Sequence, residues 1–112
     1  MTKYNSARND TKPFSDQCVQ LALAATTALT YTIPGTSANA YQATFSWPYN
    51  ANVWVGYNKT ATLPSAGTIA AVSQIELRPD KRYVRGGDVL SFISTAVVTD
   101  AGLELLSLPN PN

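Results

Sequence analysis

Histidine is missing from this sequence, and cysteine occurs once, as Cys18, among 112 residues. Without histidine the chain lacks the commonest general base and the commonest metal ligand of proteins. A single thiol excludes an intrachain disulfide and, with no histidine to accompany it, an ordinary zinc site. We therefore expect no metal and no cofactor, and we expect Cys18 to be a small, buried, apolar side chain.

Charge is also scarce, since Asp, Glu, Lys and Arg make up 13% of the chain, about half the share typical of soluble domains. The net charge is only +1. Proteins that bind nucleic acid or anionic membranes normally carry a marked basic excess. The sequence also has no apolar run of the roughly 20 residues that a membrane-spanning helix needs. Neither nucleic acid nor a membrane is therefore an expected partner.

The seven carboxylates form no recognisable catalytic pattern. Most of them stand beside a cation or in a turn, where a solvated or capping role is expected. A glycosidase would need two of them to converge on a cleft. The glycine turn at 85–88 lacks the spacing of phosphate-binding loops. We expect no catalytic residues and no enzymatic activity.

Apolar residues are abundant and alternate with polar ones in the manner of β-strands. Between Val19 and Ile33 the odd-numbered positions are mostly apolar, and this period of two predicts a strand. A short helix beginning at Ser15 is the alternative for the first part of this run. Residues 41–47 and 53–57 also alternate. The turn-forming segment between them predicts a β-hairpin.

Further strands are predicted at 69–77, 89–94 and 103–108, with a charged connection at 78–83 and a tight turn at 85–88. About seven or eight short strands with Gly and Pro between them predict an all-β fold, an antiparallel β-sandwich or jelly roll. A polar N-terminal arm, residues 1–16, precedes a single domain, residues 17–112.

The few charges are unevenly distributed, because Lys59 is the only charged residue between Gln17 and Ile75. Soluble monomers normally scatter charge over their surface. Protein interfaces lack charge at their centres, since desolvating an ion is costly. This distribution predicts broad contact with other subunits. The alternative is a sandwich whose exterior is simply neutral and rich in threonine.

Two clusters are candidates for binding. Aromatic and asparagine side chains gather at 47–57, and Trp and Tyr are favoured interface anchors, although stacking faces beside amides also suit a sugar. We expect Trp47 inside and Tyr49 exposed at a loop tip. Residues 76–88 carry four positive and three negative charges. Such a mixed cluster forms salt bridges better than it binds phosphate, and an acidic patch on a partner is its second possible use.

The segment Tyr83–Ser94, with the sequence YVRGGDVLSFIS, resembles small phage virion proteins in which a Gly-Asp turn leads into a Leu-Ser-Phe strand. The whole chain is similar to the cement or staple proteins that decorate capsids of tailed bacteriophages. The shared features are a polar arm, Thr- and Ala-rich β structure, no histidine and few charges. The resemblance implies a jelly roll or sandwich that binds across capsomer boundaries and reinforces the shell.

On this resemblance we expect a structural decoration protein on the capsid surface of a virion, made in the host cytoplasm. Its partners would be the major capsid protein and neighbouring copies of itself, as a homo-oligomer. The alternatives are a carbohydrate-binding module and a tail or fibre accessory protein. The candidate partner-binding residues are Lys3, Arg8, Lys12, Tyr49, Asn52, Trp54, Arg78, Lys81, Arg82 and Arg85.

Overall fold

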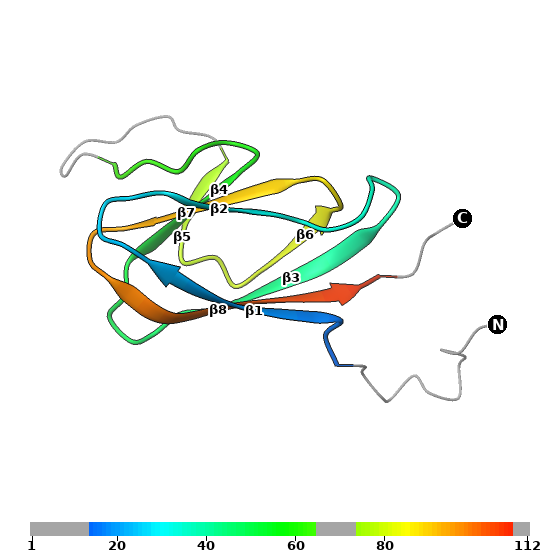
Figure 1. The fold of residues 1–112 in the computed structure, drawn as a ribbon, viewed down its shortest axis with the longest axis horizontal. Helices are drawn as coiled ribbons and strands as arrows, with labels where there is room; N and C mark the ends of the chain where they lie inside the picture. The colour runs from blue at the N-terminus through cyan, green and yellow to red at the C-terminus, as the bar shows by residue number, and fades with distance from the viewer. Residues whose placement is uncertain (1–13, 65–73, 109–112) are drawn as a thin grey trace.

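The computed structural model describes residues 14–64 and 74–108, which contain eight β-strands and no helix. The strands are β1 Gln17–Leu23, β2 Leu29–Thr32, β3 Ala40–Ser46, β4 Val53–Tyr57, β5 Ile75–Leu77, β6 Lys81–Arg85, β7 Val89–Ser94 and β8 Val98–Ser107. They form two four-stranded sheets, in the orders β1-β8-β3-β6 and β2-β7-β4-β5. We call them sheet A and sheet B; Figure 1 shows them as two stacked layers.

The strand order is that of a jelly roll. Strand β1 pairs with β8, β2 with β7, β3 with β6 and β4 with β5, and every pair is antiparallel. Two further pairings, β3 with β8 and β4 with β7, join these ribbons into the two sheets. The predicted all-β antiparallel sandwich is confirmed.

The core lies between the sheets, where alternate residues of each strand point inward. Leu103 and Leu105 of β8 face Phe92 of β7, and all three side chains are fully buried. The Trp47 ring is stacked on Phe45, with centroids 5.7 Å apart, and is half-buried against this core. Trp47 therefore lies on the inner side, as predicted.

The predicted hairpin between 41–47 and 53–57 is wrong. Strand β3 lies in sheet A and β4 in sheet B, so the segment between them crosses from one layer to the other. The strands themselves were correctly predicted, because alternation reports which side is buried. Alternation does not report which neighbour a strand pairs with.

Three other strand predictions need correction. The run 19–33 is two strands in different sheets, β1 and β2, separated by a turn in which Thr26 has φ 56°. The predicted connection 78–83 is only partly a connection, because its residues 81–83 belong to strand β6, Lys81–Arg85. Strand β8 begins at Val98 rather than at 103. Of the predicted strand 69–77, residues 75–77 form β5, and residues 69–73 lie outside the described ranges.

Candidate interaction surfaces

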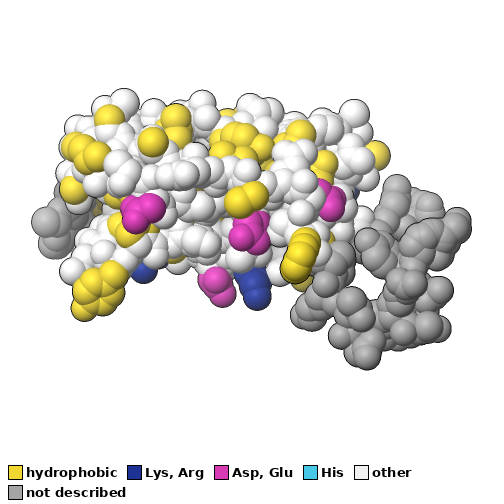
Figure 2. Space-filling model, turned by 60° about the horizontal axis from the view of Figure 1, so that its bottom comes forward, with side chains coloured by type: hydrophobic (Ala, Val, Ile, Leu, Met, Phe, Trp, Pro, Cys, Tyr) yellow, Lys and Arg dark blue, Asp and Glu magenta, His cyan; other side chains and the backbone are white. Residues whose placement is uncertain are grey.

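The outer face of sheet A is mostly uncharged along β1 and β3. Its side chains include Gln20, Gln42, Thr44 and Ser46, together with Glu104, whose carboxylate accepts a hydrogen bond from the Ser15 hydroxyl (3.0 Å). At the β6 edge of the same face, Lys81 and Arg85 lie opposite Thr44 and Ala40. Figure 2 shows the molecule with the β1 and β8 side brought forward; several Asp and Glu side chains and some Lys or Arg side chains lie there among uncharged ones. A face of this kind can be covered without desolvating many ions.

The outer face of sheet B is partly covered by the chain itself. Residues 58–64 run back over it, and the Ala61 N–H donates to the buried hydroxyl of Ser91 (2.9 Å). A Cβ on Gly56 would lie 2.3 Å from the carbonyl oxygen of Lys59, so the absent side chain lets this segment approach the sheet. The open uncharged face therefore belongs to sheet A.

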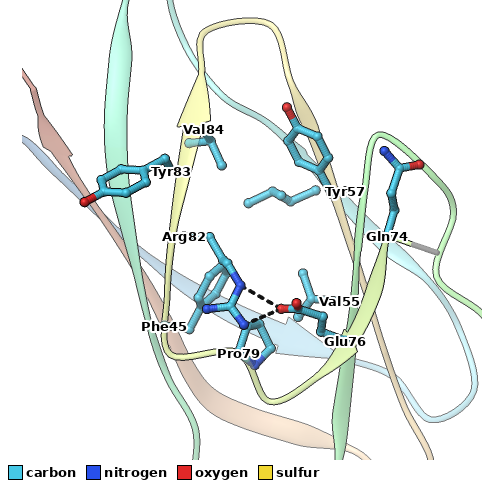
Figure 3. A pocket seen from close by; sticks show the side chains of 10 residues that line it. Phe45, Val55, Tyr57, Gln74, Glu76, Pro79, Arg82, Tyr83 and Val84 are labelled. Atoms are coloured by element: carbon cyan, nitrogen blue, oxygen red, sulfur yellow. Dashed lines mark hydrogen bonds and ion pairs between the residues drawn. The ribbon is translucent and has the colours of Figure 1, made fainter.

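Between the edge strands β5 and β6 the sandwich opens into a hollow of about 240 Å³. Its floor is apolar and includes Phe45 and Val55, while Arg82 and Glu76 reach toward each other across it (Figure 3). These two side chains form an ion pair of 2.7 Å that links sheet A to sheet B. Each is about half exposed, at 51%, so the pair contributes little to stability.

A hydrogen-bond network at the turn between β6 and β7 is centred on Asp88. Its carboxylate accepts hydrogen bonds from the Tyr57 hydroxyl (2.9 Å), the Asn58 amide (3.2 Å) and the backbone N–H of Arg85 (2.8 Å). The Asn58 amide oxygen in turn accepts from the N–H of Val89 (2.7 Å). The network ties the end of β4 to this turn.

The network shifts two pKa values. Burial by itself would raise the pKa of Asp88, but the three hydrogen bonds and the nearby Arg85 guanidinium outweigh it, so the pKa lies below its usual value. The hydrogen bond to Asp88 raises the pKa of Tyr57, and burial and the Asp88 charge add to this rise. Asp88 is therefore held ionised and Tyr57 neutral.

The predicted aromatic and amide group is divided between two places. Tyr49 is 91% exposed at the tip of the β3–β4 crossing, as predicted. Tyr49 and Asn52 line one hollow, which they share with the loop between β7 and β8. Trp54 lies on the outer face of sheet B, paired laterally with Ile93 and Leu77. The three residues therefore do not form a single sugar-stacking platform.

The predicted basic residues have different surroundings. The Arg78 guanidinium donates to the carbonyl oxygens of Pro48 and Ala51, which fastens the β3–β4 crossing. Arg82 is in the ion pair with Glu76, and Arg85 donates to the carbonyl oxygen of Ser37 (3.0 Å). Lys81 is exposed on β6. Lys3, Arg8 and Lys12 lie outside the described residues.

Two surface features escaped the sequence analysis. Cys18 is exposed, not buried as predicted, because it points away from the core on β1, next to the inward-facing Val19. Tyr83 is 77% exposed on the rim of the β5–β6 hollow. The alternation of Tyr83 with the buried Val84 could have revealed its strand, but the surrounding charges suggested a loop.

Within residues 14–64 and 74–108, no group of three His, Cys, Asp or Glu side chains is placed to hold a metal ion. The same residues contain no helix long and apolar enough to cross a membrane. Comparison of the chain with protein-family models, with curated proteins and with solved structures gave no match.

Proposed function

We propose that this chain is a structural virion protein that decorates a phage capsid and stabilises it by binding across neighbouring shell subunits. The observation that carries the proposal is the segregation of charge. In residues 14–64 the charged side chains are Asp16 and Lys59, whereas seven charged residues lie between Glu76 and Asp88. One part of the described molecule is thus neutral, and the opposite sheet edge holds most of the charge.

The outer face of sheet A is the surface that we assign to the shell. Its Gln, Thr and Ser side chains can form hydrogen bonds with a partner at a small desolvation cost, compared with the ions of an ordinary exterior. A jelly roll by itself carries no function, because one fold serves many unrelated activities. The proposal therefore rests on this surface together with the resemblance to capsid cement proteins.

The mechanism is additive. Each copy contacts the major capsid protein through the neutral face, and the polar arm of residues 1–16, with Lys3, Arg8 and Lys12, reaches a second shell subunit. Because the contacts of one copy are linked, the second is formed at a high effective concentration. Many copies together then resist expansion of the shell, on the capsid surface and without a cofactor.

A single charge placed in the neutral face tests this assignment. Ser46 is exposed at the end of β3, and Ser46→Lys should weaken binding of the purified chain to undecorated capsids at least about tenfold, because the ammonium must be desolvated. Co-sedimentation of chain and capsids gives the affinity. Thr62→Lys, an exposed position on the segment that crosses sheet B, adds the same charge and should bind as the unchanged protein does.

Equal loss of affinity in both variants would indicate a general charge effect and would contradict the assignment of sheet A. Binding of neither the variants nor the unchanged protein to capsids would contradict the decoration function itself. A glycan screen of the same preparation tests the sugar-binding alternative, for which the exposed Tyr49 beside Asn52 is the remaining structural support.

A further inference from the structure

The four open sheet edges differ in how they are protected. An edge strand presents unpaired N–H and C=O groups, and proteins normally guard it with lysine, proline or other charges. Strands β1 and β6 are the edges of sheet A, and β2 and β5 are the edges of sheet B. On one side of the sandwich lie β1 and β2, and residues 17–32 contain no Asp, Glu, Lys, Arg or Pro.

The hydrogen-bond pattern shows which N–H and C=O groups of β1 have no partner among the described residues. The N–H of Leu108 donates to the carbonyl of Ala40 (2.9 Å). In the paired part of β8, the backbone N–H and C=O groups of even-numbered residues therefore point toward β3, and those of odd-numbered residues point toward β1. From Gln17 to Leu21, odd residues of β1 lie opposite odd residues of β8; beyond a bulge in the pairing, Leu23 lies opposite Val98. The N–H and C=O groups of Cys18, Gln20 and Ala22 therefore point out of the sheet edge.

The opposite edge of the same sheet is guarded. The Phe45 N–H donates to the Asp80 carbonyl (2.9 Å), so the backbone N–H and C=O groups of even-numbered β6 residues point toward β3. The outward groups of β6 thus belong to Lys81, Tyr83 and Arg85, two of which are cations. A second strand would pair less readily there than along β1.

We infer that β1 pairs antiparallel with β1 of a second copy, which joins two A sheets into one continuous sheet. Strand β1 has seven residues, and complete overlap of two such strands about a two-fold axis centres the pairing on Gln20. Gln20 is one of the residues whose N–H and C=O point outward. The register that overlaps most is therefore also one that the backbone can bond, with Cys18 opposite Ala22 of the second copy.

A second copy fits this edge better than a charged partner does. No residue of β1 carries a charge, so the two-fold axis brings no like charges together, and each copy supplies the same outward groups. The joined sheet would present the two neutral outer faces side by side. Its use against a capsid rests on the proposed function, whereas the pairing itself is a property of the isolated protein.

Charge substitutions at Gln20 test the pairing in the full-length protein. Its side-chain amide donates to the carbonyl of Thr99 (2.8 Å), and a lysine amine can make the same bond. In the proposed dimer the two residue-20 positions lie directly opposite, with Cα atoms about 5.5 Å apart. Gln20→Lys and Gln20→Glu should each raise the dimer dissociation constant at least about tenfold, and an equimolar mixture should associate again. Sedimentation equilibrium measures the association of each Gln20 variant and of their mixture, with Thr62→Lys as the control.

Cross-linking through Cys18 gives a second test of the pairing, without any charge substitution. In the centred register the two Cys18 side chains project from the same face, about 14 Å apart by strand geometry. A bismaleimide of that span should cross-link the unchanged protein. The double variant Cys18→Ser with Lys81→Cys moves the thiol to the opposite edge and should not be cross-linked within the dimer. Cross-linking thus decides the matter even where a Gln20 variant fails to fold.

Three results would overturn the inference. The unchanged protein could remain a monomer at about 100 µM with no cross-link, which would leave β1 open or covered by the chain's own arm. A dimer could persist unaltered in both Gln20 variants, which would place the interface elsewhere. The mixed variants could fail to associate although each one folds. Failure of capsid binding with an intact dimer would contradict only the proposed function.

Discussion

Asp88 acts as a junction in this small fold, because three donors from two elements converge on one carboxylate. Its pKa is lowered, so the folded state binds its proton more weakly than the unfolded state does. The resulting stabilisation is fully present above the unfolded-state pKa of about 3.9 and is lost as the pH falls through the folded-state pKa. For Tyr57, whose pKa is raised, the stabilisation is present below about pH 10 and is lost as the pH rises further.

Asp88→Asn tests this junction. At pH 7 the variant should unfold about 1–2 kcal/mol more easily, since an amide replaces an acceptor of three hydrogen bonds. Urea unfolding followed by tryptophan fluorescence between pH 7 and pH 2 measures the difference, which should shrink progressively as the pH falls below about 3.9, because the unfolded state then binds the proton more strongly than the folded state. Asp100→Asn, at an exposed position of β8, should change stability by less than about 0.5 kcal/mol. A difference that is constant with pH would contradict the role of Asp88.

At the scale of elements, the strands were more predictable than their partners. The alternation in 41–47 and 53–57 located β3 and β4, because every second side chain of these strands is buried and apolar residues occupy those positions. Strand β4 belongs to the other sheet because it pairs with β5 and β7, and Arg78 holds the crossing through the carbonyl oxygens of Pro48 and Ala51; no local pattern reveals these long-range contacts. Strand β6 was missed because Lys81, Arg82 and Arg85 belong to an edge, where charge is compatible with a strand.

The break between β1 and β2 was missed for a different reason. Ala25 and Thr27 keep the odd-even pattern in phase through the turn, so the periodicity continues although both side chains are exposed. The turn is fixed by a contact between distant segments, the bond from the Thr26 N–H to the Ser94 carbonyl (2.8 Å). The candidate surface was likewise only partly predictable: its neutrality was visible in the sequence, and its position on sheet A was not.

The segment that crosses sheet B gives a prediction about packing. In Gly56→Ala the new Cβ would meet the backbone oxygen of Lys59, which cannot move without displacing the segment, so the free energy of unfolding should fall by about 1–3 kcal/mol. Gly102→Ala is the matched control in a central strand, since its nearest neighbour would be the Ser46 Cβ at 3.6 Å, an ordinary contact. Chemical denaturation of both variants gives the comparison. Equal effects at the two glycines would mean that the segment does not lie against Gly56.

At the scale of the whole molecule, charge and edge structure are distributed together. The side with β5 and β6 carries the ion pair, the Asp88 network and cations on the outward positions of β6. On the other side, residues 17–32 of β1 and β2 carry no charge, and β1 has backbone groups without a partner among the described residues. The proposed contacts, with a second copy along one edge and with a shell across one face, would use this asymmetry, because desolvating uncharged groups costs less than desolvating ions.

The central claim, that this chain decorates a capsid, is tested most directly by its copy number. Quantitative mass spectrometry of virus particles purified from the source of the chain would count it against the major shell protein. The account predicts hundreds of copies per particle, in a simple ratio to the shell subunit. A handful of copies would place the protein in the tail, and its absence from the particle would contradict the account.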